Sequence, residues 1–305
     1  PFYVIPHYAA GFTSLCLGDL ARARRHLEEG IANYDPAQRQ SPVYWAGQDP
    51  GVACRIYAAL TLWLLGYPDE ALTRAQDGLA LANELAHPFS EAFALVGISF
   101  IARIRRDSRR AFDNAEAAVI LSSEHGFPSW LALGTLLRGS ALTALGQQKE
   151  GINQLRQGIK DWRAIGTELF VPFYLALLAE GYGGLNQVDE AFDALKEGWE
   201  VIEQTDEQWW NAELNRLKGE LLWQHSTMDK VQAENYFQKA LEVAQNQQAK
   251  SLELRAATSM AKFWLSQGKS EKAHDILAPV YNWFTEGMET SDLREAKTLL
   301  TAPQS

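Results

Sequence analysis

The triplet Gly268-Lys269-Ser270, in the stretch LSQGKSEKAHDIL, has the residue types that close a phosphate-binding P-loop. A P-loop needs the pattern G-x-x-x-x-G-K-S/T between a strand and a helix, because its backbone N–H groups must cradle phosphates. Phe263 stands where the first glycine is required, and the preceding segment RAATSMAKFWLSQ has a helical pattern. We therefore interpret the triplet as the end of one helix and the start of the next, and expect no nucleotide site.

The histidines and cysteines are the other residues that could do chemistry. The sequence has six histidines, no two of them at a metal-ligand spacing, and two cysteines that form no C-x-x-C motif. Cys16 and Cys54 are predicted on parallel helices, roughly 15 Å apart along the axis at 1.5 Å rise per residue, which is too far for a disulfide. The sequence thus predicts no metal site, no cofactor and no catalytic constellation.

The composition argues against several classes of function. With a formal net charge of −10, the chain as a whole repels nucleic acid and anionic membranes. No apolar run reaches the roughly 18 residues that cross a bilayer, and two cysteines in so long a chain are typical of a reducing cytoplasm. We expect a cytoplasmic protein with no nucleic-acid or membrane partner. Because the sequence begins at Pro1 without an initiator methionine, we also expect it to be part of a longer chain.

A small residue followed by an apolar one recurs about every 40 residues, as in LGYPDEAL, LGQQKEGI and LNQVDEAF. The small residues of this series are Ala23, Ala71, Ala111, Gly151, Ala191, Ala233 and Ala273. A second small position follows on the same helix face, at Gly30, Gly78, Ala118, Gly158, Gly198, Ala240 and, less strictly, Val280. A third precedes the series, at Gly11, Ala59, Ser99, Gly139, Ala179, Gly219 and Ala261. Each unit is therefore predicted to contain a helix A, a short turn and a helix B that crosses it closely.

This pattern resembles the tetratricopeptide repeat over nearly the whole chain. The period exceeds the usual length of about 34 residues, as in MalT-like bacterial regulators; HEAT repeats share the period but are disfavoured by the regular small positions. The resemblance implies an all-α fold, a right-handed superhelical solenoid of about seven helix-turn-helix repeats with a C-terminal capping helix. A single domain over residues 1–305 is expected, with units at 1–34, 50–86, 88–125, 128–165, 168–205, 207–247 and 249–286, an inserted loop at 35–49 and the cap at 291–300.

Helix A positions that face the groove usually bind the partner in tetratricopeptide domains. Transferred to this chain, this register and the neighbouring charges give Tyr8, Phe12, Arg55, Trp63, Phe100, Arg103, Glu180, Glu213, Arg216, Glu220 and Arg255, together with Trp223 and Lys262. The N-terminal half of this set is aromatic and the C-terminal half is charged, which indicates an apolar and a polar clamp. The alternative is that the aromatics seal helix contacts and the charges are solvated.

We favour docking on helices A of the first three units, beside the inserted loop, because long loops in compact repeats are often functional. Arg55 and Arg103 would suit an anionic or carboxylate-bearing ligand there.

Four stretches resemble the C-terminal repeat region of large bacterial signalling proteins: GQDPGVACRIYAALTLWLLGYPDEAL, HPFSEAFAL, GFPSWLALGTLLRG and AKSLELRAATSMAKFW. In those proteins a class III nucleotide cyclase, a kinase or a DNA-binding domain precedes a STAND-type ATPase. The resemblance carries over no catalytic residue. It implies a sensor or regulatory arm that binds a protein, peptide or small-molecule signal and contacts the upstream ATPase or cyclase domains. The alternative is a structural scaffold that forms homo-oligomers and has no ligand of its own.

Overall fold

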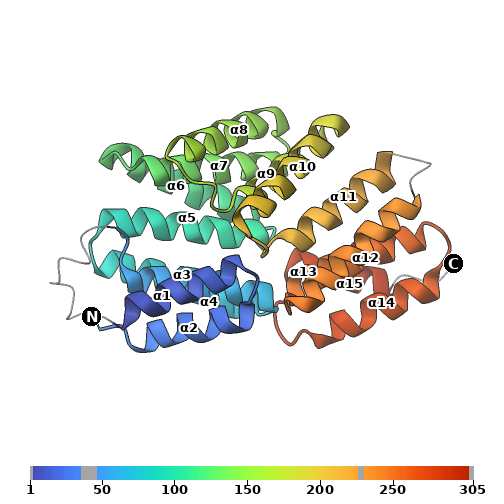
Figure 1. The fold of residues 1–305 in the computed structure, drawn as a ribbon, viewed down its shortest axis with the longest axis horizontal. Helices are drawn as coiled ribbons and strands as arrows, with labels where there is room; N and C mark the ends of the chain where they lie inside the picture. The colour runs from blue at the N-terminus through green and yellow to red at the C-terminus, as the bar shows by residue number, and fades with distance from the viewer. Residues whose placement is uncertain (1–2, 36–46, 226–229, 302–305) are drawn as a thin grey trace. The chain divides into compact units, whose positions relative to one another are not determined.

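The computed structural model describes residues 3–35, 47–225 and 230–301, and every regular element in these ranges is a helix (Figure 1). The helices are α1 Val4–Cys16, α2 Leu20–Ala32, α3 Pro50–Leu65, α4 Pro68–Glu84, α5 Pro88–Ile104, α6 Ser108–His125, α7 Pro128–Ala144, α8 Gln148–Ala164, α9 Val171–Gly184, α10 Val188–Thr205, α11 Asn211–His225, α12 Lys230–Asn246, α13 Lys250–Leu265, α14 Ser270–Trp283 and α15 Ser291–Thr301. The odd-numbered helices up to α13 are the predicted helices A, the even-numbered ones are the helices B, and α15 is the cap. The predicted all-α fold is confirmed.

The small residues of the repeat lie where the two helices of a pair cross. All seven residues of the first series are buried. In the pair α7 and α8, a Cβ atom on Gly139 would lie 2.7 Å from the carbonyl oxygen of Gly151. One on Gly158 would lie 2.7 Å from the Cβ of Leu136. The helices therefore reach this separation only because glycine has no side chain.

Helix boundaries follow from local sequence signals. Asp19 and Asp107 cap α2 and α6, because their carboxylates accept hydrogen bonds from backbone N–H groups of the first turn. The donors are Arg22 at 3.1 Å and Arg110 at 3.2 Å. The helix α5 begins with Pro88, whose fixed φ suits the first turn and whose missing N–H would have no partner there.

The Gly268-Lys269-Ser270 triplet lies in the turn between α13 and α14. Gly268 has a φ of +72°, in the left-handed region that favours glycine, and Gly146 in the equivalent turn has a φ of +88°. Phe263 is buried within α13, so the segment before the triplet is a helix and not a strand. The prediction of a turn at this position is confirmed.

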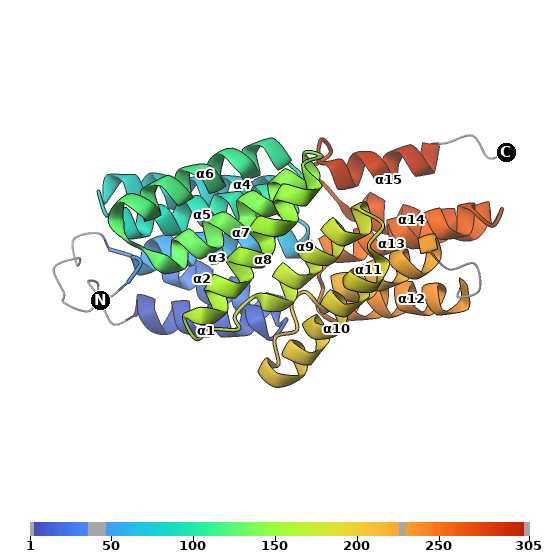
Figure 2. The ribbon, with the colours of Figure 1, turned by 90° about the horizontal axis from the view of Figure 1, so that it is seen from above.

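The chain divides into two compact units. The N-terminal unit comprises residues 1–63 and 69–169, and the C-terminal unit comprises residues 64–68 and 170–305. In the N-terminal unit α1 packs on α2, α5 on α6 and α7, and α7 on α8. In the C-terminal unit α11 packs on α12 and α13, and α15 packs on α13 and α14 (Figure 2). Within each unit these helices thus contact helices that follow them next or next but one in the sequence, as the repeat predicts.

Three further expectations concern the cysteines, the membrane and the inserted loop. Cys16 and Cys54 are not joined by a disulfide, and burial raises the pKa of Cys54 to about 12, so this thiol stays protonated at neutral pH. Within the described residues, no helix combines the length and the apolar character needed to cross a membrane.

Most of the inserted loop predicted at 35–49 lies outside the described residues, which resume at position 47.

Candidate binding site on the helices A

Four aromatic side chains of the N-terminal unit form a continuous patch across three helices A. Phe12 of α1 and Tyr57 of α3 have ring centroids 4.6 Å apart, and Tyr8 of α1 lies 5.9 Å from the same tyrosine. Phe93 of α5 continues the series at 5.7 Å from Tyr57. These separations lie within the range of attractive aromatic pairs. We call these four residues the aromatic patch.

The aromatic patch is only partly covered. Its members on α1 and α3 are half-buried, whereas Phe93 is buried and lies against Trp130 of α7. At the edge, the Gln48 side-chain amide donates a hydrogen bond to the Tyr8 hydroxyl at 3.2 Å. An apolar surface with a few polar groups at its rim can accept an aliphatic or aromatic side chain of a peptide.

Three residues of the N-terminal unit that the register placed in the groove are buried. Trp63 is 2% exposed and Phe100 is 9% exposed. Arg103 is also buried, and its Nε donates a hydrogen bond to Oγ of Ser140 at 2.6 Å. Trp63 follows Tyr57 by six positions, which turns its side chain about 120° round a helix of 3.6 residues per turn. These three side chains therefore offer little surface to a partner in this structure.

Arg55 contacts Gly51 and Tyr34 within the chain. Its Nη1 donates to the carbonyl oxygen of Gly51 at 2.9 Å, and its guanidinium carbon lies 5.5 Å from the ring centroid of Tyr34. The latter distance is typical of a cation–π contact. These contacts of Arg55 and the hydrogen bond of Arg103 go to different residues, and a joint role of the two arginines toward an anionic ligand stays a prediction.

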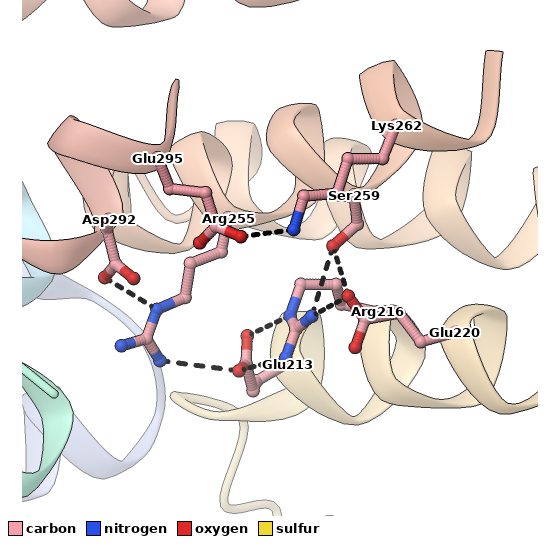
Figure 3. Close-up of polar contacts among 8 residues, drawn as sticks. All are labelled: Glu213, Arg216, Glu220, Arg255, Ser259, Lys262, Asp292 and Glu295. Carbon is pink, nitrogen blue, oxygen red and sulfur yellow. Dashed lines mark hydrogen bonds and ion pairs between the residues drawn. The ribbon is translucent and has the colours of Figure 1, made fainter. Parts of the chain in front are cut away.

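The predicted charged residues of the C-terminal unit converge (Figure 3). Arg216 of α11 binds Glu213 through two parallel hydrogen bonds, from Nε to Oε2 at 2.9 Å and from Nη2 to Oε1 at 2.8 Å. Its Nη1 lies 2.6 Å from Oε1 of Glu220 and donates to Oγ of Ser259 on α13 at 3.1 Å. The Ser259 hydroxyl donates to Glu220 at 2.7 Å. These bonds tie α11 to α13.

Two cations of α13 extend the same set of contacts to the capping helix. Nη1 of Arg255 lies 3.4 Å from Oε1 of Glu213, and its Nε donates to Oδ2 of Asp292 on α15 at 2.9 Å. Lys262 pairs with Glu295, also on α15. The charged network, as we call it, consists of Glu213, Arg216, Glu220, Arg255, Ser259, Lys262, Asp292 and Glu295. It crosses α11, α13 and α15 in succession.

The charged network is buried at one end and open at the other. The side chains of Glu213 and Arg255 are 2% and 10% exposed, whereas those of Lys262 and Glu295 are 35% and 30% exposed. A charged group of a partner can therefore reach the network most easily at the open end.

The field of the surrounding carboxylates keeps Arg216 charged. Burial alone lowers the pKa of this guanidinium, but Glu213 and Glu220 outweigh burial, and the pKa lies well above its ordinary value. Glu180 of α9, another predicted groove residue, adds to the same effect. Four predicted residues of the C-terminal unit therefore act on one another electrostatically.

A separate buried acid lies between α10 and α11. The Glu207 carboxylate accepts hydrogen bonds from the backbone N–H of Phe170 at 2.9 Å and from Nε1 of Trp209 at 2.6 Å. Burial raises the pKa of Glu207 to about 7, although both hydrogen bonds favour the charged form. Trp209 and Trp210 are both buried, so they belong to the core.

Five residues of these two sites were not predicted from the sequence. Tyr57 and Phe93 complete the aromatic patch, and the signal for them was an aromatic residue in the first half of successive helices A. Ser259 of α13 also belongs to the charged network, as do Asp292 and Glu295. The latter two stand three residues apart, which places them on one face of a helix, but the cap had been left out of the groove register.

Comparisons with known proteins support a tetratricopeptide-like fold. A sequence model of the tetratricopeptide repeat matches residues 5–29 and 52–77. An uncharacterized protein of Rhizobium meliloti (strain 1021) is 26% identical over 258 residues; the similarity covers 83% of this chain and 25% of that protein. The chain thus spans about a quarter of the length of this curated relative.

Two solved structures resemble almost the whole chain. A Rap protein complexed with competence and sporulation factor has a TM-score of 0.64 at 11% identity, covering 96% of this chain and 75% of the other. NprR in complex with its cognate peptide NprX has a TM-score of 0.63 at 13% identity, covering 97% and 82%. At such low identity these likenesses establish the fold, an all-helical solenoid of the tetratricopeptide type.

Proposed function

We propose that this chain is a non-catalytic binding module that takes up a peptide or a protein segment along its helices A. The aromatic patch carries the proposal, because three of its four rings stay half-buried although they pack against one another. Partly exposed tyrosine and phenylalanine side chains supply large contact area at small entropic cost. In support, the structures of Rap and NprR, which share the fold, hold a competence and sporulation factor and a cognate peptide.

The charged network provides a second contact region in this proposal. Its open end presents the Lys262 ammonium and the Glu295 carboxylate, and a partly exposed ion pair contributes only about 0–1 kcal/mol. Charged side chains of a bound peptide can therefore replace this pair at low cost. The buried pair of Glu213 and Arg216 keeps its geometry and fixes the helices beneath.

We infer further that the module is the sensor or regulatory arm of a larger bacterial signalling ATPase or nucleotide cyclase in the cytoplasm. The similarity to the Rhizobium meliloti relative covers a quarter of that protein, which is consistent with a module inside a longer chain. The four sequence stretches that resemble the repeat region of such signalling proteins add to this inference. A ligand would regulate the parent chain only if it bound two arrangements of the arm with different affinities.

A structural scaffold is the second candidate. It is favoured by the charged network itself, because every charge drawn in Figure 3 already has a partner within the chain. A scaffold would use the helices A to contact a second copy and would take up no peptide.

A peptide selection separates the two candidates. Random peptides displayed on phage are selected against the chain, and enriched sequences are titrated by calorimetry. We predict that one peptide binds per chain with micromolar affinity and that Tyr57→Ala binds it at least tenfold more weakly. Lys196→Ala, on the helix B α10, should leave binding unchanged. Failure to enrich any peptide, together with self-association in sedimentation experiments, would favour the scaffold.

A further inference from the structure

Two histidines and a glutamate converge on the first helix pair. Nδ1 of His7 on α1 lies 3.2 Å from Nδ1 of His26 on α2 and 3.0 Å from Oε2 of Glu29. Nδ1 of His26 lies 3.9 Å from the same carboxylate oxygen. The two histidines are 19 residues apart in the sequence, so no ligand spacing announces them. Only the antiparallel packing of α1 on α2 brings them together, and the sequence-based expectation of no metal-ligand group overlooked this.

The three atoms have the geometry of a metal-ligand set. Their separations form a triangle whose circumscribed circle has a radius of about 2.0 Å, so one point lies about 2.0 Å from all three atoms. Bonds from Zn²⁺ to histidine nitrogen are about 2.0–2.1 Å and bonds to carboxylate oxygen about 2.0–2.2 Å. A Zn²⁺ ion can therefore contact all three atoms with little movement of the side chains.

Hydrogen bonds within this cluster satisfy its three facing atoms poorly. A neutral imidazole carries one N–H, and a carboxylate carries none, so the three facing atoms are mainly lone-pair acceptors. If both Nδ1 atoms were protonated, two N–H groups would face each other at 3.2 Å. A single proton between His7 and Glu29 leaves His26 without a bond toward the centre, whereas one divalent cation satisfies all three atoms at once.

The fold presets the cluster and leaves it open to solvent. His26 and Glu29 stand three residues apart on one face of α2. Gly30, the next residue after Glu29, lies in ordinary van der Waals range of this site, because a Cβ on this glycine would lie 3.6 Å from the Cβ of His7. The side chains of His7 and His26 are 21% and 20% exposed, and that of Glu29 is 47% exposed, so an ion and a water molecule can enter.

We propose that His7, His26 and Glu29 form a binding site for a divalent transition-metal ion of the Zn²⁺ class. Two imidazoles and one carboxylate suit zinc and its neighbours better than calcium or magnesium, which prefer all-oxygen ligands. The set supplies three protein ligands and leaves further coordination positions to water or to an external group. The ion would join α1 to α2 beside Tyr8, the first residue of the aromatic patch. The site is independent of the proposed peptide binding.

The test is a metal titration of the chain after removal of bound metals with a chelator. Zn²⁺ is titrated in competition with a chromophoric chelator, and Co²⁺ is followed through its visible absorption bands, which are intense at low coordination number. We expect one ion per chain with micromolar or tighter affinity and a rise in Tm on adding Zn²⁺. Glu29→Gln, at an exposed position that should not affect folding, and His26→Ala should each weaken binding at least tenfold and abolish the rise in Tm.

The matched control is His274→Ala, which removes an exposed histidine beside Asp275 and should leave binding unchanged. Affinity weaker than about 100 micromolar in the unaltered chain would overturn the proposal. Equal affinities in the unaltered chain and in the Glu29→Gln and His26→Ala variants would also overturn it, because the ion would then be held elsewhere. Circular dichroism of each variant excludes unfolding as the cause of a loss.

Discussion

Single glycines set the distance between the two helices of a repeat, and Gly158 allows a direct test. We predict that Gly158→Leu lowers the free energy of unfolding by about 1–3 kcal/mol or more, because the added side chain would overlap Leu136 on the facing helix. Lys160→Leu is the control, since Lys160 is exposed two positions further along α8. Urea unfolding measures both. Similar losses for the two variants would mean that the small positions have been assigned to the wrong helix face.

Glu207 makes stability depend on pH in a direction opposite to most carboxylates. Its pKa is about 7 in the folded chain and near 4.5 in the unfolded chain, so the folded state binds more protons between these values. The contribution of this group to stability is complete below the unfolded pKa and is lost as the pH rises through about 7. A shift of this size corresponds to about 3 kcal/mol.

The corresponding variant is Glu207→Gln, which cannot ionise. We expect the free energy of unfolding of the unaltered chain, measured in urea, to fall between about pH 5 and about pH 8. In the variant this fall should be smaller, and the difference should equal the contribution of the Glu207 carboxyl. The absolute stability of the variant falls as well, because the amide nitrogen cannot accept the hydrogen bond that one carboxylate oxygen accepts. Asp206→Asn at the exposed neighbouring position is the control. An unchanged pH slope in Glu207→Gln would contradict the assignment.

At the scale of helices, the charged network joins α11, α13 and α15 by means of one buried carboxylate. Glu213 accepts hydrogen bonds from two guanidinium groups, and removing its charge leaves Arg216 and Arg255 poorly compensated in a buried site. We predict that Glu213→Gln costs about 3 kcal/mol or more, the usual range for breaking a buried ion pair.

The exposed pair of Lys196 and Glu200 on α10 provides the comparison for Glu213→Gln. Its N–O distance is 3.7 Å and both side chains are more than half exposed, so Glu200→Gln should cost less than about 0.5 kcal/mol. Chemical unfolding of the two variants gives both numbers. If Glu213→Gln were as mild as Glu200→Gln, the contacts drawn in Figure 3 would not hold these helices together.

The sequence predicted the helices well because their signals are local. Pro88 and Asp107 mark helix starts, and glycines such as Gly268 mark turns, independently of contacts with distant parts of the chain. The binding surface was harder to predict, because it depends on rotation about each helix axis. A register taken from other repeats selected Arg216 and Arg255, which both contact Glu213, but it also selected Trp63, which is buried.

The pair of His7 and His26 was invisible for a related reason. Its two members belong to different helices, and the spacing rules used for metal sites count residues along the chain. The repeat itself contained part of the missing information, because the small position Gly11 of α1, which lies against Leu27 of α2, already indicated which turns of the two helices lie close together.

At the scale of the whole molecule, we propose that the helices A provide the recognition surface and that the helices B support it. The repeat explains this division, because each helix A must present one face to its neighbours and keeps another for contacts outside the chain. The aromatic patch lies on helices A, and so does the charged network apart from Asp292 and Glu295 on the cap; the two belong to different compact units.

The most direct test of this claim is photo-cross-linking with a peptide from the selection. The peptide carries a photoreactive phenylalanine analogue, and mass spectrometry locates the cross-linked residues. We predict cross-links to α1, α3 and α5, around Phe12 and Tyr57. An excess of unlabelled peptide should suppress these cross-links. Links confined to the helices B, such as α2, α4 and α6, would contradict it.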